Sequence, residues 1–119
     1  MKRGDVWTVA GSGDYGGKPR PALILQDDSF AATQSVTICL FTTDPTDAPL
    51  MRVPVAPSPA NGLREPSRLM IDKLTTVPRS RLGERLGVVD DAVLLQVART
   101  VVLFLGIAGA ASRPASAQE

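Results

Sequence analysis

Short apolar runs separated by turn-forming residues occupy the first half of the chain, and this pattern predicts β-strands. The predicted strands are residues 6–9, 22–26, 36–41 and 51–55. The second and third runs are almost continuously apolar, which is typical of central strands that are buried in a sheet. Pro54 in the fourth run has no backbone N–H to donate, and it therefore predicts an edge strand.

The middle of the chain mixes extended and turn-forming sequence. Residues 57–66 predict a long turn-rich connection, and residues 67–77 predict a further extended segment that ends at Pro78. The stretch 80–86, which Gly87 follows, predicts one short helical or 3₁₀ turn.

The periodicity becomes helical after Asp90. Apolar side chains then recur at three- and four-residue spacing, at Val93, Leu94, Val97, Val101 and Leu105. Asp90 or Asp91 can cap the first exposed amides of this predicted helix. Residues 111–119 are small, polar and proline-containing, and they predict a flexible tail.

Together these elements predict a mainly β fold with α structure (α+β). The expected architecture is a strongly bent antiparallel sheet or half-open barrel with a C-terminal helix packed on it. An alternating strand–helix fold is disfavoured, because too few helical segments lie between the early strands to cover a parallel sheet. With 119 residues, 44% of them hydrophobic, the chain is expected to form a single domain over residues 1–110 followed by the tail.

The charge balance restricts the kind of partner. Thirteen Lys and Arg against twelve Asp and Glu give a formal net charge of +1, so any contact with nucleic acid must be local. The chain has no histidine, the usual general base and the commonest metal ligand. Serine-hydrolase triads and zinc-hydrolase sites are therefore disfavoured, and no metal site is expected.

The compartment is predicted from cysteine usage and from apolar stretches. Cys39 is the single cysteine, which excludes an internal disulfide and favours the reducing cytoplasm. It lies in an apolar run and is expected to be a small core residue. The first residues lack the apolar segment of a secretory signal, and the longest uncharged apolar stretch, 101–111, falls short of the roughly 20 residues needed to cross a bilayer.

Arg20 lies between two prolines, directly after the glycine-rich stretch 11–17 and at the start of an apolar run. Each proline fixes its own φ at about −65° and biases the preceding residue toward extended backbone. A guanidinium on such a stiff backbone is suited to bind a phosphate. The alternative is a surface arginine that closes a turn.

Several short motifs occur in series along the chain. They are residues 3–7 (RGDVW), the glycine-rich loop, residues 20–28 (RPALILQDD), residues 40–43 (LFTT), and residues 70–77 (MIDKLTTV) followed by residues 81–83 (RLG). In this order and approximate spacing, from about Arg3 to about Gly106, the chain resembles the MazF/PemK family. These proteins are messenger-RNA-cleaving toxins of bacterial toxin–antitoxin pairs.

The resemblance implies an activity, a fold and partners. The implied activity is cleavage of single-stranded RNA at a short sequence without metal or cofactor. In it, the ribose 2′-hydroxyl attacks the neighbouring phosphate and leaves a cyclic phosphate and a free 5′-hydroxyl. The implied fold is an SH3-like barrel. The implied partners are a second copy of the chain in a homodimer and a MazE/PemI-like antitoxin whose acidic segment fills the RNA groove.

The resemblance also assigns catalytic roles. Arg20 matches the family's catalytic arginine, which would stabilise the charge that develops on the phosphate oxygens. Thr42 matches the family's threonine and would donate a hydrogen bond to the same phosphate. Thr43 is the adjacent alternative, although strand alternation should turn it to the other face.

The general base for the 2′-hydroxyl stays open between two carboxylates. Asp14 lies in the glycine-rich loop, where some relatives carry a glutamate. Asp72 matches an aspartate of the PemK-type branch, but that branch has an arginine two positions earlier, where this chain has Met70. A structural role for Asp72, in a turn or paired with Lys73 of a neighbouring chain, is the alternative.

Further RNA contacts are expected from Lys18, Tyr15, Gln26, Thr43 and Lys73. Lys18 would contact a phosphate, Gln26 a base edge, and Tyr15 would stack on an unpaired base. Trp7 and Phe30 are further stacking candidates, although a tryptophan in a first strand is more often a core residue.

Two other functions compete with RNA cleavage. One is a non-catalytic toxin like CcdB, which poisons DNA gyrase through a C-terminal Trp-Gly-Ile. The only tryptophan here is Trp7 and the chain ends Ser-Ala-Gln-Glu, which counts against it. The other is a small RNA- or peptide-binding barrel without catalysis.

Overall fold

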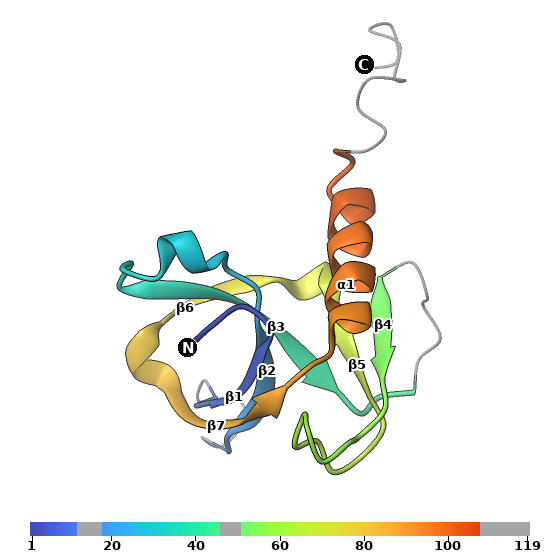
Figure 1. Cartoon of the computed structure of the whole chain (residues 1–119), viewed down its shortest axis with the longest axis horizontal. Coiled ribbons are helices and arrows are strands. Elements are labelled where there is room, and N and C mark those ends of the chain that lie inside the picture. The colour runs from blue at the N-terminus through green and yellow to red at the C-terminus, as the bar shows by residue number, and fades with distance from the viewer. Residues whose placement is uncertain (12–17, 46–50, 108–119) are drawn as a thin grey trace, which may run out of the picture.

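A bent antiparallel sheet carries one long helix that stands on it and projects beyond it (Figure 1). The structure is a computed structural model and describes residues 1–11, 18–45 and 51–107. The strands are β1 (Asp5–Val9), β2 (Arg20–Ile24), β3 (Ser35–Thr42), β4 (Arg52–Val55), β5 (Ser67–Met70), β6 (Thr75–Pro78) and β7 (Leu82–Val88). Three 3₁₀ turns, η2 (Asp28–Phe30), η3 (Ile71–Lys73) and η4 (Arg79–Arg81), and helix α1 (Asp91–Phe104) complete the fold. The predicted tail, 111–119, lies outside the described residues.

The strands follow the order β4-β5-β3-β2-β1-β7, and β6 pairs with β3 beside this path. The paired strands in the described part of the chain are antiparallel. One edge of β3 is shared: its first half pairs with β6, and its last two residues pair with β5. The sheet therefore bends around β3 without closing into a barrel. The predicted fold class is confirmed.

The four early strands were predicted within one or two residues of their observed bounds. Strands β2 and β3 are central, and β4 lies at the edge as Pro54 requires. The extended segment 67–77 is interrupted by η3, which turns the chain between β5 and β6.

The prediction of a helical turn over residues 80–86 is wrong beyond Arg81. Residues 82–88 form β7, which pairs with the outer edge of β1. A Cβ on Gly83 would lie 2.5 Å from the Thr8 hydroxyl oxygen, so the glycine permits the close approach of these strands. Pairing with a distant strand overrides local propensity here.

Two apolar clusters lie on the two faces of the sheet, because side chains alternate along β2 and β3. Leu23 and Cys39 belong to the cluster under α1, together with Val97 of the helix. Ala22 and Ile38 belong to the second cluster, which continues to Val9, Ile24, Val36 and Val77. The face that carries the second cluster also carries the candidate site.

Helix α1 is fixed at its N-terminal half. The Asp90 side chain accepts a hydrogen bond from the Val93 amide at 2.9 Å, and the helix packs on β4 and η3. Gly4, with φ at 96°, lies so close to the helix that a Cβ there would be 3.0 Å from Leu94.

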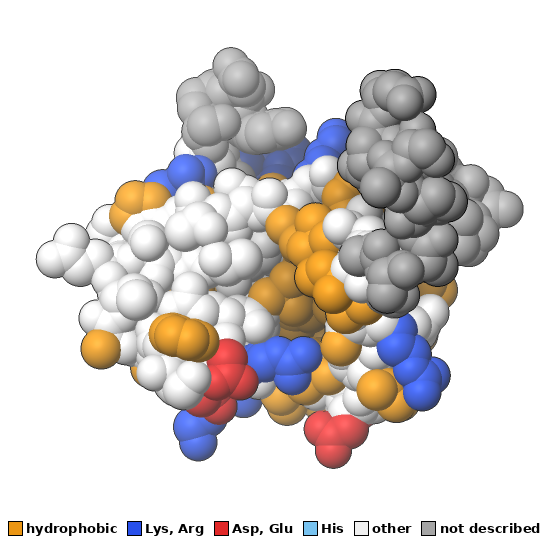
Figure 2. All heavy atoms as spheres, turned by 90° about the horizontal axis from the view of Figure 1, so that it is seen from above, with side chains coloured by type: hydrophobic (Ala, Val, Ile, Leu, Met, Phe, Trp, Pro, Cys, Tyr) orange, Lys and Arg blue, Asp and Glu red, His pale blue; other side chains and the backbone are white. Residues whose placement is uncertain are grey.

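Large apolar side chains are exposed toward the far end of α1, including Leu103, Phe104 and Leu105. Figure 2 looks down on this end of the molecule and shows apolar side chains there, with Lys and Arg dispersed in several places. Within residues 1–11, 18–45 and 51–107, no helix combines the length and apolar character needed to span a membrane.

Candidate functional site

Arg20 and Thr42 come from neighbouring central strands. Strands β2 and β3 pair with Ala22 opposite Leu40. Extending this antiparallel register by two residues, back along β2 and forward along β3, sets Arg20 beside Thr42 on the same face. The predicted catalytic arginine and threonine are therefore together, at the end of the sheet where β2 begins and β3 ends.

Both side chains line a cleft of about 400 Å³. Its cationic lining residues are Arg20, Arg52, Lys73 and Arg81. Apolar side chains line it as well, and these include Val9, Ile38, Leu40, Met70 and Val77. A hollow with apolar walls and several guanidinium groups is suited to an anion with apolar parts, such as a nucleotide.

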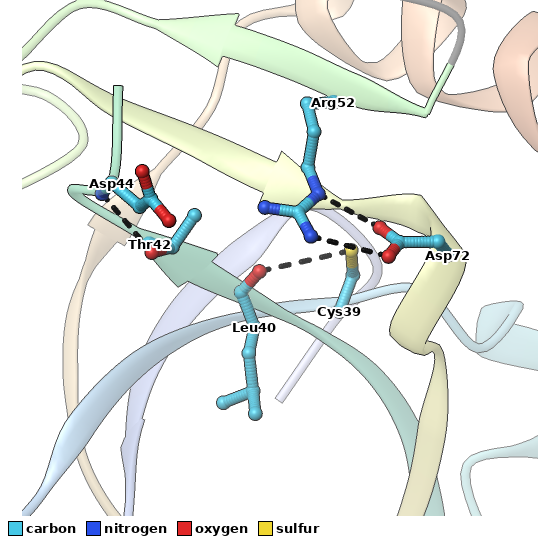
Figure 3. Close-up of polar contacts among 6 residues, drawn as sticks. All are labelled: Cys39, Leu40, Thr42, Asp44, Arg52 and Asp72. Atoms are coloured by element: carbon cyan, nitrogen blue, oxygen red, sulfur yellow. Dashed lines mark hydrogen bonds and ion pairs between the residues drawn. The ribbon is translucent and has the colours of Figure 1, made fainter. Parts of the chain in front are cut away.

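The Thr42 hydroxyl is oriented by the next turn of the chain. Its oxygen accepts a hydrogen bond from the Asp44 amide at 3.1 Å (Figure 3). Because this bond uses an oxygen lone pair, the hydroxyl proton can be donated to an acceptor in the cleft. Thr42 is thus prepared as a donor.

Asp72 forms an ion pair with Arg52, a residue that the sequence reasoning missed. Arg52 Nε lies 2.8 Å from Asp72 Oδ1, and Nη2 lies 3.2 Å from Oδ2 (Figure 3). The side chains are 14% and 19% exposed. The two hydrogen bonds from Arg52 lower the pKa of Asp72 below its usual value. Asp72 therefore has an ion-pair partner within its own chain.

Arg52 is also relevant to position 70, where this chain has a methionine and the PemK-type branch has an arginine. In the ladder between β4 and β5, Arg52 lies directly opposite Met70. A guanidinium therefore reaches this part of the cleft from the neighbouring strand, although position 70 holds a methionine. Alternation along the predicted strand could have indicated that the Arg52 side chain lies on the other face from Val53 and Val55. Only the order of the strands in the sheet shows that its partner is Asp72.

The other predicted RNA contacts are divided by the fold. Lys73 lines the cleft, and Thr43 lines a second hollow that continues from Thr42 past Pro54 and Pro66. Lys18 is exposed, two residues before Arg20. Asp14 and Tyr15 lie outside the described residues.

Gln26 is not brought to this cleft. Its side-chain amide donates to the Phe30 carbonyl and to the Thr33 hydroxyl, each at 2.8 Å. Its Oε1 accepts from the Thr37 amide at 3.2 Å. These bonds stabilise the connection between β2 and β3 and use the amide that a base edge would require.

Arg81 is a second cleft residue without an assigned role in the sequence analysis, although it begins the RLG motif. Its Nη2 donates to the Ala10 carbonyl, at the end of β1.

Cys39 is fully buried on the opposite face of β3, and burial raises the pKa of its thiol to about 12. The thiol is therefore neutral at pH 7 and has no role as a nucleophile. Among the described residues, no three His, Cys, Asp or Glu side chains are grouped so as to hold a metal ion.

The fold and the cleft define a small bent-sheet protein that presents guanidinium groups and an oriented hydroxyl at the ends of its central strands. Residues 2–105 match the PemK-like, MazF-like toxins of type II toxin–antitoxin systems, and the chain belongs to this family. It is 55% identical over 109 residues to the probable endoribonuclease MazF of Mycolicibacterium smegmatis. That alignment covers 92% of this chain and 100% of the relative.

Solved structures agree with the family assignment. The Mycobacterium tuberculosis toxin MazF-mt6 has a TM-score of 0.71 and 25% identity, and the match covers 85% of this chain and 95% of that one. A mycobacterial endoribonuclease in complex with its cognate antitoxin has the same TM-score and identity, with coverage of 89% and 93%. A MazE-MazF crystal structure from Deinococcus radiodurans has a TM-score of 0.73 at 23% identity, covers 89% and 95%, and supports the fold.

Proposed function

We propose that this chain is a MazF-type endoribonuclease toxin that cleaves single-stranded RNA at a short sequence and needs no metal. The observation that carries the proposal is the presence of Arg20 and Thr42 in one cleft, where β2 begins and the neighbouring strand β3 ends. The family and the 55% identical probable endoribonuclease support the same activity.

In the proposed reaction, a bond forms between the ribose 2′-oxygen and the phosphorus, and the bond from phosphorus to the 5′-oxygen breaks. The 2′-hydroxyl loses its proton and the leaving 5′-oxygen gains one from solvent, so the products are a 2′,3′-cyclic phosphate and a 5′-hydroxyl. Negative charge builds on the nonbridging oxygens, where the Arg20 guanidinium and the Thr42 hydroxyl stabilise it. Arginine stays protonated at neutral pH, so Arg20 acts through charge and hydrogen bonds.

The ion pair changes the assignment of the base. A carboxylate whose pKa is lowered is a weaker proton acceptor, and Asp72 is held in this state by Arg52. We therefore assign Asp72 to positioning Arg52, and of the two carboxylates Asp14 is the one we propose to take the 2′-hydroxyl proton.

Cleavage of fluorescently labelled single-stranded RNA in EDTA tests the proposal. The wild-type protein should cut, and Arg20→Ala should lower the rate at least about 100-fold, since a main stabiliser of transition-state charge is lost. Arg64→Ala, which removes an exposed arginine outside the cleft, is the matched control and should retain activity. Equal rates for wild type and Arg20→Ala would remove Arg20 from the mechanism.

The proposed partners follow from the same assignment. We propose that the chain forms a homodimer, acts in the cytoplasm on messenger RNA and is neutralised by a cognate MazE/PemI-like antitoxin. Lys73 lines the cleft and is the predicted RNA contact that it supports best. Thr43 lines the adjoining hollow, and Lys18 is exposed two residues before Arg20. Light scattering after size-exclusion chromatography, alone and with the product of an adjacent gene, measures both assemblies.

A further inference from the structure

One cationic residue of the cleft, Arg52, forms an ion pair with Asp72 that the proposed reaction does not use. Arg52 and Asp72 are both mostly covered, and Arg52 lines the cleft beside Thr42 and Asp44. Partly buried ion pairs add little net stability, because the loss of hydration offsets much of the attraction between the charges. A binding role for the guanidinium accounts better for its place in the cleft wall.

The carboxylate fixes one side of the guanidinium and leaves the other side directed into the cleft. Asp72 accepts from Nε and Nη2, and Nη1 points the opposite way, toward Thr42 and Asp44 (Figure 3). The outer end of the guanidinium carries the two Nη1 hydrogens and the second Nη2 hydrogen. These donors form a planar fork that fits two oxygens of one phosphate.

The strand order sets the separation between Arg52 and Thr42, the residue proposed to contact the reacting phosphate. Thr42 lies opposite Arg68 of β5, and Arg52 lies opposite Met70 of the same strand. Since residues two apart share a face, Thr42 and Arg52 project from the same side of the sheet with β5 between them. Two strand spacings across the sheet and two residues along it separate their backbones by about 12 Å. Arg20 and Arg52 thus approach the cleft from opposite sides of Thr42.

We propose that Arg52 binds the RNA phosphate next to the scissile one and that Asp72 is a positioning residue that holds the guanidinium for this contact. The inference rests on the proposed function. A backbone phosphate carries no base identity, so Arg52 sets the register of the RNA in the cleft and base choice lies elsewhere. Because Asp72 orders the arginine before RNA arrives, less side-chain freedom is lost on binding.

The contact is made equally in the substrate and in the transition state, so its loss should raise KM and leave kcat nearly unchanged. The test uses RNA cut by the wild-type protein, with a neutral methylphosphonate placed at one flanking position at a time. With the wild-type protein, a methylphosphonate at one of the flanking positions should raise KM about 10- to 100-fold, as expected for the loss of a hydrogen bond to a charged group. Arg52→Ala should raise KM on unmodified RNA by a similar factor.

The decisive measurement combines the Arg52→Ala variant with the methylphosphonate RNA. In Arg52→Ala, the methylphosphonate at that position should have no further effect, because its partner is already absent. Arg64→Ala should keep the wild-type response. If the effects of Arg52→Ala and of every flanking methylphosphonate multiply, the contact does not exist. Failure of the wild type to cut any RNA would instead overturn the proposed function, and this inference with it.

Two further variants separate positioning from folding. Asp72→Asn removes the charge at nearly constant shape, and it should weaken but not abolish the effect of the methylphosphonate. A purely structural Asp72 would lower the melting temperature without altering that effect, which would contradict the positioning role. Arg52→Gln keeps much of the side-chain bulk, and it replaces Arg52→Ala if the alanine variant does not fold. Arg52→Lys should not restore KM, because a lysine cannot contact Asp72 and a phosphate with a planar fork.

Discussion

At the scale of single residues, the contact between Asp72 and Arg52 links a strand to a 3₁₀ turn. Arg52 begins β4, and Asp72 lies in η3, which directly follows β5. The sequence presents Asp72 as a candidate base, but the structure presents it as a carboxylate held by two donors. The same contact makes the stability of the protein depend on pH.

The hydrogen bonds from Arg52 lower the pKa of Asp72 in the folded chain below its ordinary value of 3.8. Between the pKa of Asp72 in the folded chain and its pKa in the unfolded chain, the unfolded chain therefore binds more protons than the folded chain. The stabilisation by the pair is complete above about pH 4 and is lost as the pH falls through the folded-state pKa. Asp72→Asn should accordingly lower the free energy of unfolding at pH 7, and its difference from wild type should shrink below about pH 4.

Urea unfolding monitored by circular dichroism between pH 2 and pH 7 measures this difference. Glu84→Gln, which changes an exposed carboxylate of β7, is the control and should show a small difference throughout. A difference for Asp72→Asn that stays constant down to pH 2 would contradict the assigned charge interaction.

At the scale of elements, α1 and β7 illustrate two ways in which a segment is determined. The helix was predicted because its apolar spacing and its aspartate cap are local signals. Strand β7 was not, because residues 82–88 become a strand only through pairing with β1, which lies more than seventy positions earlier. Gly83 permits this pairing through its contact with Thr8, and that contact cannot be read from either segment alone.

The cap of α1 gives a prediction at this scale. Asp90 accepts from the Val93 amide at 2.9 Å, so Asp90→Ala should reduce the free energy of unfolding by about 1 kcal/mol. Asp90→Asn retains an acceptor oxygen and should stay close to wild type. Urea unfolding of the three proteins at pH 7 provides the comparison, and equal losses in the two variants would show that the negative charge, and not the cap, is what matters.

At the scale of the whole molecule, the near balance of charges restricts how RNA is held. The formal net charge is +1, and the cationic side chains that line the cleft are Arg20, Arg52, Lys73 and Arg81. RNA binding should therefore depend on a few local contacts and not on a broad positive field.

The salt dependence of binding measures the number of these contacts. With four cations from the cleft and a factor of about 0.7 per phosphate for single strands, log K against log salt should have a slope of about −3 per protomer. A 2′-O-methylated RNA keeps the phosphates but lacks the nucleophile, so binding can be followed by fluorescence anisotropy without cleavage. A slope near −6 or steeper would show that phosphates are also bound well outside the cleft.

The sequence alone determined the positions of the four early strands in the chain, the edge position of β4, the capped helix and the burial of Cys39. These features depend on residues close together in the chain, through apolar alternation, proline chemistry and helical spacing. It also singled out Arg20 and Thr42 by their likeness to a family, and the antiparallel register of β2 and β3 brings the two together.

The tertiary structure decided the rest. The pairing of β7 with β1, the break between β5 and β6, and the ion pair of Arg52 with Asp72 each join segments distant in sequence. Hydrogen bonds between strands and the direction of a guanidinium depend on which backbones become neighbours. These neighbours are set by the bend of the sheet around β3. Because of this bend, Arg52 of the edge strand β4 lines the cleft.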